Sequence, residues 1–277
     1  MPSFVVNLPA LLRDALEREA TRVKDSPSNV VAAAIGQYLG TPAHTVFQVS
    51  TSGALVAGVY AGVVSVRTLL NHGDFGLGTF ANLDGEMVVL DGLAYQVQGT
   101  GRVSVADREA RAPFAVVTRF TPDTDTTIEA VHSFEELTHQ CDELRKSSNI
   151  FYAFRLDGRF KVVRARAVNP SEGEARLVDT AKAQSEFTFS EVEGTLVGIW
   201  SPAFSSAFSV PGYHFHFLSD DRRQGGHLLD CISAGDLRLQ CESMTDFHLV
   251  LPETASFLNA DLSNDPAAEL AYAEQAH

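Results

Sequence analysis

The chain of 277 residues is 45% hydrophobic and 20% charged, a balance typical of a globular protein and unlike that of a disordered or fibrous chain. Its formal net charge of −14 disfavours nucleic acid as a partner, because an acidic surface repels the phosphate backbone. No apolar stretch reaches the length of a membrane span, and the N-terminus lacks the pattern of a signal peptide, so we expect a cytoplasmic protein. The three cysteines fit no disulfide or zinc framework, and we expect them to be buried and reduced.

Residues 1–40 form a separate unit in the sequence. Residues 3–8 alternate like a short strand, and a helix is expected after Pro9, where apolar side chains recur at helical spacing. Ser26 and Pro27 are a typical N-cap and first helical residue, and they predict a second helix. This order of strand, helix and helix resembles the ribbon-helix-helix module, in which two strands pair across a two-fold axis and enter a DNA groove.

The outward side chains of the predicted strand argue against a role on DNA. Direct reading of bases needs donors such as arginine or lysine, together with neighbours that neutralise phosphates. The outward residues are Ser3, Val5 and Asn7, and none of them is basic. We therefore expect residues 1–40 to be a dimerisation segment, which predicts a homodimer or a higher homo-oligomer.

Residues 45–277 are rich in Val, Phe, Ile and Thr, and turn signals interrupt these strand-like runs. Asp157-Gly158 suits a type I′ turn and predicts a hairpin. Helical patterns are fewer, and they occupy residues 52–60, 65–72 and 133–147. We predict a β-dominated α+β fold, with a mixed sheet and a β-barrel-like C-terminal half, preceded by the short strand–helix–helix segment. The two sub-sheets would cover roughly residues 45–148 and 149–277.

Three histidines in the C-terminal half have the spacing of a metal site. Alternation along the stretch YHFHF places His214 and His216 on one strand face, with aromatic side chains on the other. A polar turn with two glycines follows, and a hairpin of this length returns His227 beside the first pair. Three neutral imidazoles that converge and leave one position open form the protein part of a catalytic zinc site.

The identity of the metal stays open at this point. Asp220 and Asp221 could also act as ligands, although residues in such a turn more often face water. An iron facial triad would need a carboxylate in place of one imidazole. A cupin also carries two histidines on a barrel strand, usually with a glutamate a few residues later, where this chain has Asp220. Manganese, nickel and iron therefore remain alternatives to zinc.

Two further segments supply polar or charged groups. A glycine-rich loop at residues 72–87 delivers Thr79 and then Glu86, which stands at the head of a strand, where a glutamate is usually solvated. Arg164 and Arg166 alternate with apolar residues and would share one strand face. They indicate either an anion-binding pair or two surface ion pairs.

Seven stretches of the chain follow one another between residues 45 and 251: FQVST, HGDFGLGTFANLDGEM, PFAVVTRF, NIFYAFRLDGRFKVVRAR, QSEF, GTLVGIWSP and PGYHFHFLSDDRRQGGHLLD. Together they resemble the α-acetolactate decarboxylase family, and the histidine stretch is the most specific of them. The resemblance implies an enzyme with one Zn²⁺ per chain that converts (S)-2-acetolactate to (R)-acetoin and carbon dioxide. The expected partner is thus a small molecule, without nucleic acid or membrane.

The resemblance also implies roles for seven residues. Three imidazoles would hold the metal, and an arginine would bind the substrate carboxylate. A metal-chelated enediolate would form as carbon dioxide leaves, and a glutamate would protonate it, assisted by a second glutamate near the C-terminus. The ligands are His214, His216 and His227, the arginine is Arg166, the glutamates are Glu86 and Glu274, and Thr79 contributes to the pocket.

Two other functions remain as alternatives. A metal-responsive DNA-binding regulator could join a ribbon-helix-helix segment to a histidine metal site. A cupin-like metalloenzyme could act on another small acid. The acidic composition and the size of the region after residue 45 argue against the regulator.

Overall fold

The computed structural model describes residues 6–23, 26–39, 44–171 and 184–274. Among these, residues 23, 29, 32, 33, 37 and 271–274 are described in their backbone alone. The chain divides into two compact units, Met1–Ala43 and His44–His277. No helix in the described ranges is long and apolar enough to cross a bilayer.

The first unit consists of two helices, α1 (Ala10–Val23) and α2 (Pro27–Leu39), which contact each other. α2 begins at the proline, as predicted. Residues 3–5 of the expected strand lie outside the described residues, and residues 6–9 form no regular element. Much of the apolar surface is uncovered within this unit, where the exposed apolar side chains are Val6, Leu11, Leu12, Ile35, Tyr38 and Leu39.

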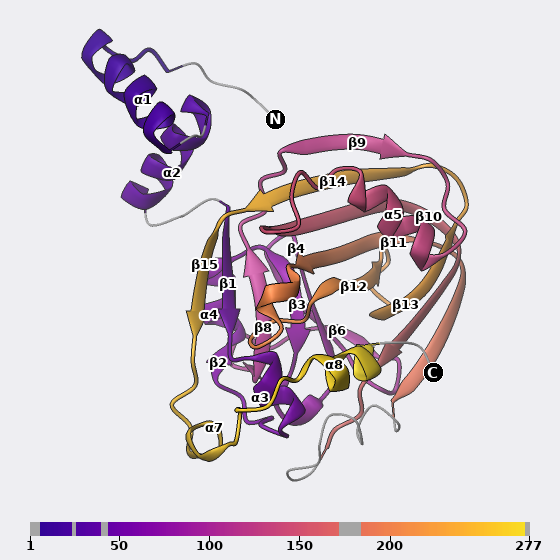
Figure 1. Ribbon diagram of the computed structural model, residues 1–277. Helices are drawn as coiled ribbons and strands as arrows, with labels where there is room; N and C mark the ends of the chain where they lie inside the picture. Colours follow the sequence, from indigo (N-terminus) through magenta and orange to yellow (C-terminus); the bar gives the residue numbers. More distant parts are fainter. Residues whose placement is uncertain (1–5, 24–25, 40–43, 172–183, 275–277) are drawn as a thin grey trace. The chain divides into compact units, whose positions relative to one another are not determined.

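A mixed seven-stranded sheet forms one layer of the second unit (Figure 1). Its edge strand β15 runs parallel to β1, and the other neighbours are antiparallel. Asp91-Gly92 joins β4 to β5 with a positive φ at both residues, which is the backbone of a type I′ turn. In spatial order the strands are β15 (Asp246–Val250), β1 (Thr45–Val49), β8 (Phe114–Thr118), β3 (Phe75–Thr79), β4 (Glu86–Leu90), β5 (Leu93–Val97) and β6 (Val103–Val105).

An antiparallel six-stranded sheet forms the second layer. Its pairings run from β11 through β12 and β13 to β10 and back to β11, so the sheet curls on itself. The predicted barrel-like half is confirmed only in part, because β14 and β9 continue the sheet to an open edge and no clear barrel results among the described strands. The strands are β11 (Ser185–Ser201), β12 (Gly212–Ser219), β13 (Gly225–Ser233), β10 (Phe151–Ala167), β14 (Leu237–Met244) and β9 (Thr124–Ile128).

The predicted hairpin at Asp157-Gly158 is wrong, because β10 runs through both residues and Gly158 pairs with Gly194 of β11. Glycine fits at position 158 for another reason, because a Cβ atom there would lie only 2.5 Å from Cδ2 of Leu237. At this point β10 changes its second neighbour, from β14 up to Asp157 to β13 from Phe160 onwards. The dipeptide therefore marks a change of strand partner and a close approach, not a turn.

Short helices and three apolar clusters complete the second unit. One cluster lies between the sheets, a second fills the curl of the six-stranded sheet, and a third lies under α4. All three cysteines are free and buried, as expected. The helices are α3 (Ser52–Val56), α4 (Val66–His72), α5 (Phe134–Asp142), α7 (Ala255–Asn259) and α8 (Ala267–Glu274), with 3₁₀ turns η1 (Ala81–Leu83) and η2 (Ala203–Ser205), and β2 (Val64–Ser65) pairs with β7 (Arg111–Ala112).

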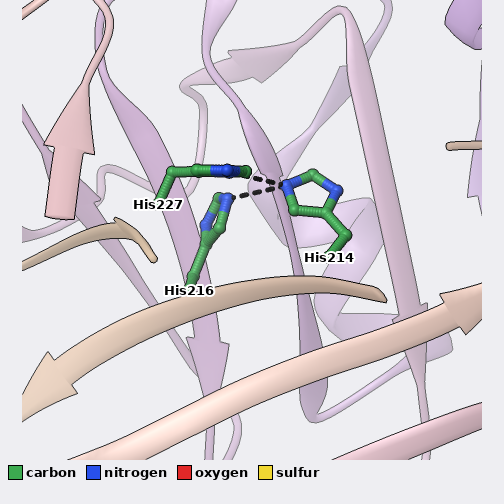
Figure 2. A group of neighbouring side chains, drawn as sticks. All are labelled: His214, His216 and His227. Carbon is green, nitrogen blue, oxygen red and sulfur yellow. Dashed lines mark hydrogen bonds between the residues drawn. The ribbon is translucent and has the colours of Figure 1, made fainter. Parts of the chain in front are cut away.

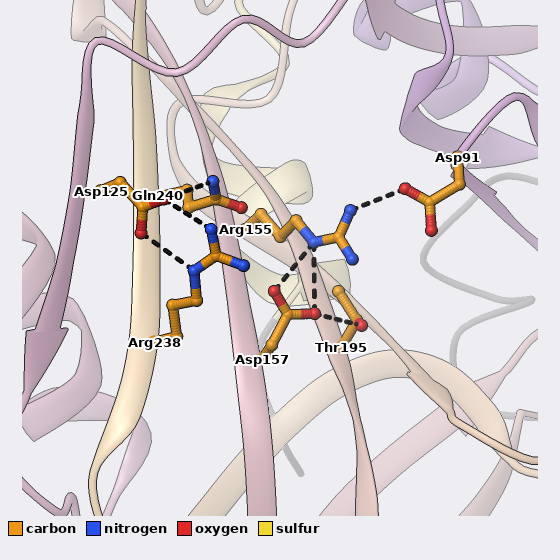
Figure 3. A network of polar contacts seen from close by, with 7 residues as sticks. All are labelled: Asp91, Asp125, Arg155, Asp157, Thr195, Arg238 and Gln240. Carbon is orange, nitrogen blue, oxygen red and sulfur yellow. Dashed lines mark hydrogen bonds and ion pairs between the residues drawn. The ribbon is translucent and has the colours of Figure 1, made fainter. Parts of the chain in front are cut away.

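One arginine links the two sheets, and a second charged pair joins two strands of the six-stranded sheet (Figure 3). Arg155 of β10 contacts Asp157 at 2.9 Å and also Asp91, in the β4–β5 turn, at 2.7 Å. Arg238 of β14 binds Asp125 of β9 through two nitrogens. Because these groups are exposed to solvent, water and salt screen their attraction, and the pairs add little to the stability of the fold. They align the strands more than they stabilise the fold.

Candidate metal centre and catalytic cavity

Three histidines gather at the β12–β13 hairpin, as the sequence predicts. Alternation along β12 places His214 and His216 on one face, and His227 of β13 is the register partner of His216. Asp220 and Asp221 are exposed in the connecting turn and do not belong to the cluster. The hairpin alone therefore brings the three imidazoles together.

Gly226 allows β13 to lie close to β10. Its φ is +143°, and a Cβ atom there would lie 2.5 Å from the carbonyl oxygen of Arg166. Only glycine accepts both this conformation and this approach. The next residue, His227, is thereby the register partner of Arg166. The second glycine of the turn thus places an imidazole beside a guanidinium.

The ring nitrogens face one another at distances that suit a metal ion. Nε2 of His214 is 3.1 Å from Nε2 of His216 and 3.1 Å from Nδ1 of His227 (Figure 2). Two nitrogen ligands of a tetrahedral Zn²⁺, each about 2.05 Å from the ion, lie roughly 3.3 Å apart. All three ligand atoms lie within 4.8 Å of one another, and no other described residue joins the group. The cluster therefore fits a cation of this size.

Hydrogen bonding and burial give these imidazoles the state that a metal ligand requires. Nδ1 of His216 lies 2.8 Å from the carbonyl oxygen of Met87, in β4. Because a carbonyl only accepts, Nδ1 carries the hydrogen and Nε2 presents its lone pair to the cluster. Burial, together with the charge of Arg166, lowers the pKa of His214 to about 3. His214 is thus neutral near pH 7, and a neutral imidazole is the form that binds a cation.

A cavity of about 60 Å³ opens beside the histidines, between the two sheets. Thr79, Glu86 and Arg166 line it together with His214 and His227, so the structure brings together these predicted residues. Its other walls are mostly apolar, formed by Leu55, Leu83, Phe114, Val168, Val210 and Leu270. Electrostatic interactions with a bound ligand are stronger in such surroundings than in water.

Glu86 lies between the cluster and the end of β10. One carboxylate oxygen accepts a hydrogen bond from the backbone N–H of Val168 (3.3 Å), and the other is 3.7 Å from Nε2 of His216. Across the sheet, the hydroxyl of Thr79 donates to the carbonyl oxygen of Gly85 (2.9 Å) and so ties β3 to the residue before Glu86. Glu86 is 7% exposed, and its carboxylate lies at the cavity wall. It is therefore buried, although a glutamate at the start of a strand is usually solvated.

Arg164 and Arg166 have different surroundings, although alternation would place them on one face. Arg166 is 4% exposed, lines the cavity and donates from Nη1 to Oε1 of Gln184 at 2.6 Å. Arg164 has a side chain that is 41% exposed and pairs with Glu186 at 3.5 Å. Residues two apart in a strand are separated by roughly 6.6 Å, which takes Arg164 beyond the cavity. Of the two readings left open for this pair, anion binding fits Arg166 and a surface ion pair fits Arg164.

Three contributors to the site are not visible as sequence patterns. Gln184 has no periodic signal, although it stands in the stretch QSEF that carries the family resemblance. The carbonyl of Met87 has no side-chain signature at all. Leu270 of α8 is 2% exposed and closes one side of the cavity. Glu274 ends the same helix one turn later, and its side chain lies outside the described residues.

Fold and site together define a β-rich protein with a buried three-histidine cluster beside a carboxylate and a guanidinium. The sequence matches the profile of the family described as alpha-acetolactate decarboxylase over residues 46–264. It is 37% identical to the alpha-acetolactate decarboxylase of Brevibacillus brevis over 234 residues, which are 84% of this chain and 82% of that protein. For the same enzyme of Bacillus subtilis strain 168, identity is 37% over 243 residues, which are 87% of this chain and 94% of the relative.

Solved structures agree with these sequence relationships. The crystal structure of alpha-acetolactate decarboxylase from Bacillus subtilis strain 168 superposes with a TM-score of 0.80 at 36% identity, and the match covers 84% of this chain and 100% of that one. A Staphylococcus aureus protein of unknown function, described as similar to this enzyme, gives a TM-score of 0.79 at 28% identity, covering 83% of this chain and 100% of the other. The chain belongs to the alpha-acetolactate decarboxylase family, a family of enzymes.

Proposed function

We propose that the protein converts (S)-2-acetolactate to (R)-acetoin and carbon dioxide, with one Zn²⁺ held by His214, His216 and His227. Membership of the family supports the reaction. One observation carries the assignment of the site: three ring nitrogens converge at the wall of a cavity that also presents Arg166 and Glu86. Three imidazoles without a carboxylate favour zinc over iron. A divalent cation at this position supplies Lewis-acid stabilisation of the negative charge that develops on the substrate oxygens.

Arg166 binds the substrate carboxylate in this proposal. Its guanidinium is fixed at Nη1 by Gln184, and a planar guanidinium matches a carboxylate through two parallel hydrogen bonds. Because the cavity is mostly apolar, this ion pair is stronger than one at the surface. Its strand neighbour is His227, so a carboxylate held there leaves the adjacent carbon near the histidines.

Glu86 supplies the proton in the second half of the reaction. When carbon dioxide leaves, the electron pair of the broken bond moves toward the neighbouring carbonyl, and an enediolate remains. This species takes up one proton on the carbon that lost the carboxylate. Glu86 is held by Val168, so it reaches one face of that carbon, and a single enantiomer results. We assign part of the proton transfer to Glu274, because Leu270, one helical turn before it, lines the cavity.

The test uses the purified chain and racemic acetolactate. We expect rapid consumption of the S form, release of one enantiomer of acetoin, loss of activity with a chelator, and recovery with Zn²⁺. Metal analysis should find one zinc per chain. Acetoin release no faster than the spontaneous reaction, with metal bound, would reject the proposed activity.

The two alternatives named from the sequence are not favoured. The family match covers residues 46–264, so the region after the first unit belongs to an enzyme family and not to a regulator. Nothing in the site favours a cupin-like enzyme acting on a different acid over the family's own reaction. The three free, buried cysteines are compatible with the proposed reducing, cytoplasmic setting.

We also propose that the first unit joins copies of the chain into a homodimer or a higher homo-oligomer. A unit of this size buries little core by itself, and Ile35 and Tyr38 of α2 are 47% and 88% exposed. Replacing both with glutamate should reduce the mass in sedimentation experiments, while Ser28→Glu on the same helix should not. An identical mass for all three proteins would reject this role.

A further inference from the structure

The loop between β3 and β4 has an unusual backbone. Two successive residues, Asn82 and Leu83, have a positive φ, of 59° and 56°. Asparagine tolerates this left-handed conformation, whereas leucine rarely adopts it, because its Cβ atom crowds the backbone. A strained residue of this kind persists only where the surrounding structure holds it in place. Contacts from outside the loop must therefore fix the position of Leu83.

The strained leucine lies at the cavity, three residues before the proposed proton donor. Leu83 is 2% exposed and lines the cavity, as Glu86 does. Between them, Asp84 has φ −75° and ψ 62°, and the N–H of Gly85 donates to the carbonyl oxygen of Leu83 at 2.8 Å. This is the geometry of an inverse γ-turn. One tight turn therefore couples the position of Leu83 to that of Glu86.

Two glutamines bind Asp84 from the side of the neighbouring strand, β5. Nε2 of Gln96 donates to the carbonyl oxygen of Asp84 at 2.6 Å and to its Oδ2 at 3.0 Å. Nε2 of Gln98 donates to Oδ1 at 3.2 Å. The residue between the two glutamines is Val97, the register partner of Glu86. The carboxylate of Asp84 is thus held on both sides of the point where Glu86 joins the sheet.

The preceding residues of the loop are fixed by backbone groups. The N–H of Asn82 donates to the carbonyl oxygen of Tyr60 at 2.9 Å, and the carbonyl oxygen of Asn82 accepts from the N–H of Ser171 at 2.8 Å. A change of side chain leaves both bonds in place. The side chain of Asp84 is therefore the contact of this loop that a substitution can remove.

We propose that Asp84 is a positioning residue, which fixes the β3–β4 loop and thereby the carboxylate of Glu86. This inference rests on the proposed function, in which Glu86 protonates one face of the enediolate. Val168 binds the same carboxylate from the end of β10, so contacts with both sheets restrain Glu86. Without the bonds to the glutamines, Leu83 relaxes toward an ordinary backbone conformation. Glu86 then loses its fixed distance from the reacting carbon.

The experiment measures kcat per bound zinc, KM and the enantiomer ratio of acetoin in Asp84→Ala. We expect kcat to fall by about 10- to 100-fold, because a misplacement of about 1 Å costs about 10²-fold in rate. The product should also lose part of its enantiomeric excess. KM should stay close to the native value, since Arg166, the proposed carboxylate-binding group, lies on β10. Asp84→Asn keeps an oxygen that accepts from the glutamine amides, so it should recover most of the rate and of the enantiomeric excess.

Asp125→Ala is the matched control. Asp125 also accepts a hydrogen bond from a glutamine amide, Nε2 of Gln240 at 3.0 Å, but it lies in β9, at the open edge of the other sheet. Its kcat per bound zinc and its enantiomer ratio should be native. If Asp84→Ala fails to fold, Gln98→Leu removes one donor to the carboxylate and is judged by the same measurements.

Hydrogen exchange provides a readout that is independent of turnover. The N–H of Gly85 should exchange faster in Asp84→Ala than in the native protein and the control. Equal exchange rates, a kcat equal to that of the control, or a loss of kcat with an unchanged enantiomer ratio would each overturn this inference and leave the proposed function intact. A native protein that releases acetoin no faster than the spontaneous reaction would instead reject the proposed function, and this inference with it.

Discussion

Replacement of Glu86 with glutamine tests the proton donor with little change in structure. The amide oxygen can still accept the hydrogen bond from the N–H of Val168, so the free energy of unfolding should change by less than about 1 kcal/mol. His216 keeps its bond to Met87, so zinc content should stay at one per chain. Loss of a general acid lowers kcat by about 10²- to 10⁴-fold, or roughly 3–5 kcal/mol in the activation barrier.

The assay follows acetoin release, the enantiomer ratio of the product by chiral chromatography, and zinc content by mass spectrometry. Glu86→Asp keeps an acid but withdraws it by one methylene, so it should retain more activity than the glutamine variant. Glu253→Gln, at an exposed position, controls for the loss of a charge. Full turnover with an unchanged enantiomer ratio in Glu86→Gln would refute the assignment. Loss of zinc in that variant would show a role in metal binding instead.

Three further predictions concern a ligand, the carboxylate site and pH. His216→Ala should lose zinc and acetoin formation together, and activity without metal would contradict the mechanism. Arg166→Ala should keep its zinc and lower kcat/KM, with a loss of transition-state stabilisation of about 2–5 kcal/mol, since it truncates one member of a buried charge pair. Metal loss would count against its role. The contact of His44 with buried Glu242 (3.2 Å) raises the pKa of His44, although burial opposes this. The contact therefore stabilises the folded protein below the ordinary histidine pKa, and this stabilisation is lost as pH rises through the raised pKa of the folded state. The urea midpoint of the native protein should fall over that pH range. The midpoint of His44→Gln should not show this fall.

Local signals predict the elements of this fold better than their partners. The proline at the start of α2 and the helical patterns near α3, α4 and α5 all correspond to helices. Two Asp-Gly dipeptides have opposite outcomes, because Asp91-Gly92 forms a hairpin turn while Asp157-Gly158 lies inside β10. The difference arises from Leu237 and from strands β11, β13 and β14, which are distant in sequence. A two-residue preference is weak compared with pairing along a whole strand.

The site was predictable to the extent that its residues share one hairpin. Period-two alternation and a turn of suitable length are enough to bring His214, His216 and His227 together, and both are readable in the sequence. Glu86 and Arg166 come from other strands. Local patterns singled out both residues, but only the family resemblance indicated that they share a site with the histidines. Gln184 and the carbonyl of Met87 act through tertiary contacts, so no local pattern could reveal them.

In the proposed mechanism, β4 links metal binding to proton transfer. Glu86 and Met87 are neighbours in this strand: the first places its carboxylate at the cavity wall, and the backbone of the second fixes the tautomer of His216. Loss of an orienting partner of this kind typically weakens metal binding by about 10- to 100-fold without any change in the ligands. A substitution that shifts β4 relative to β12 should therefore impair metal affinity and protonation together, while one confined to the β12–β13 turn should affect metal affinity alone. In this mechanism, the position of β4 in the seven-stranded sheet therefore affects the metal site on the six-stranded sheet.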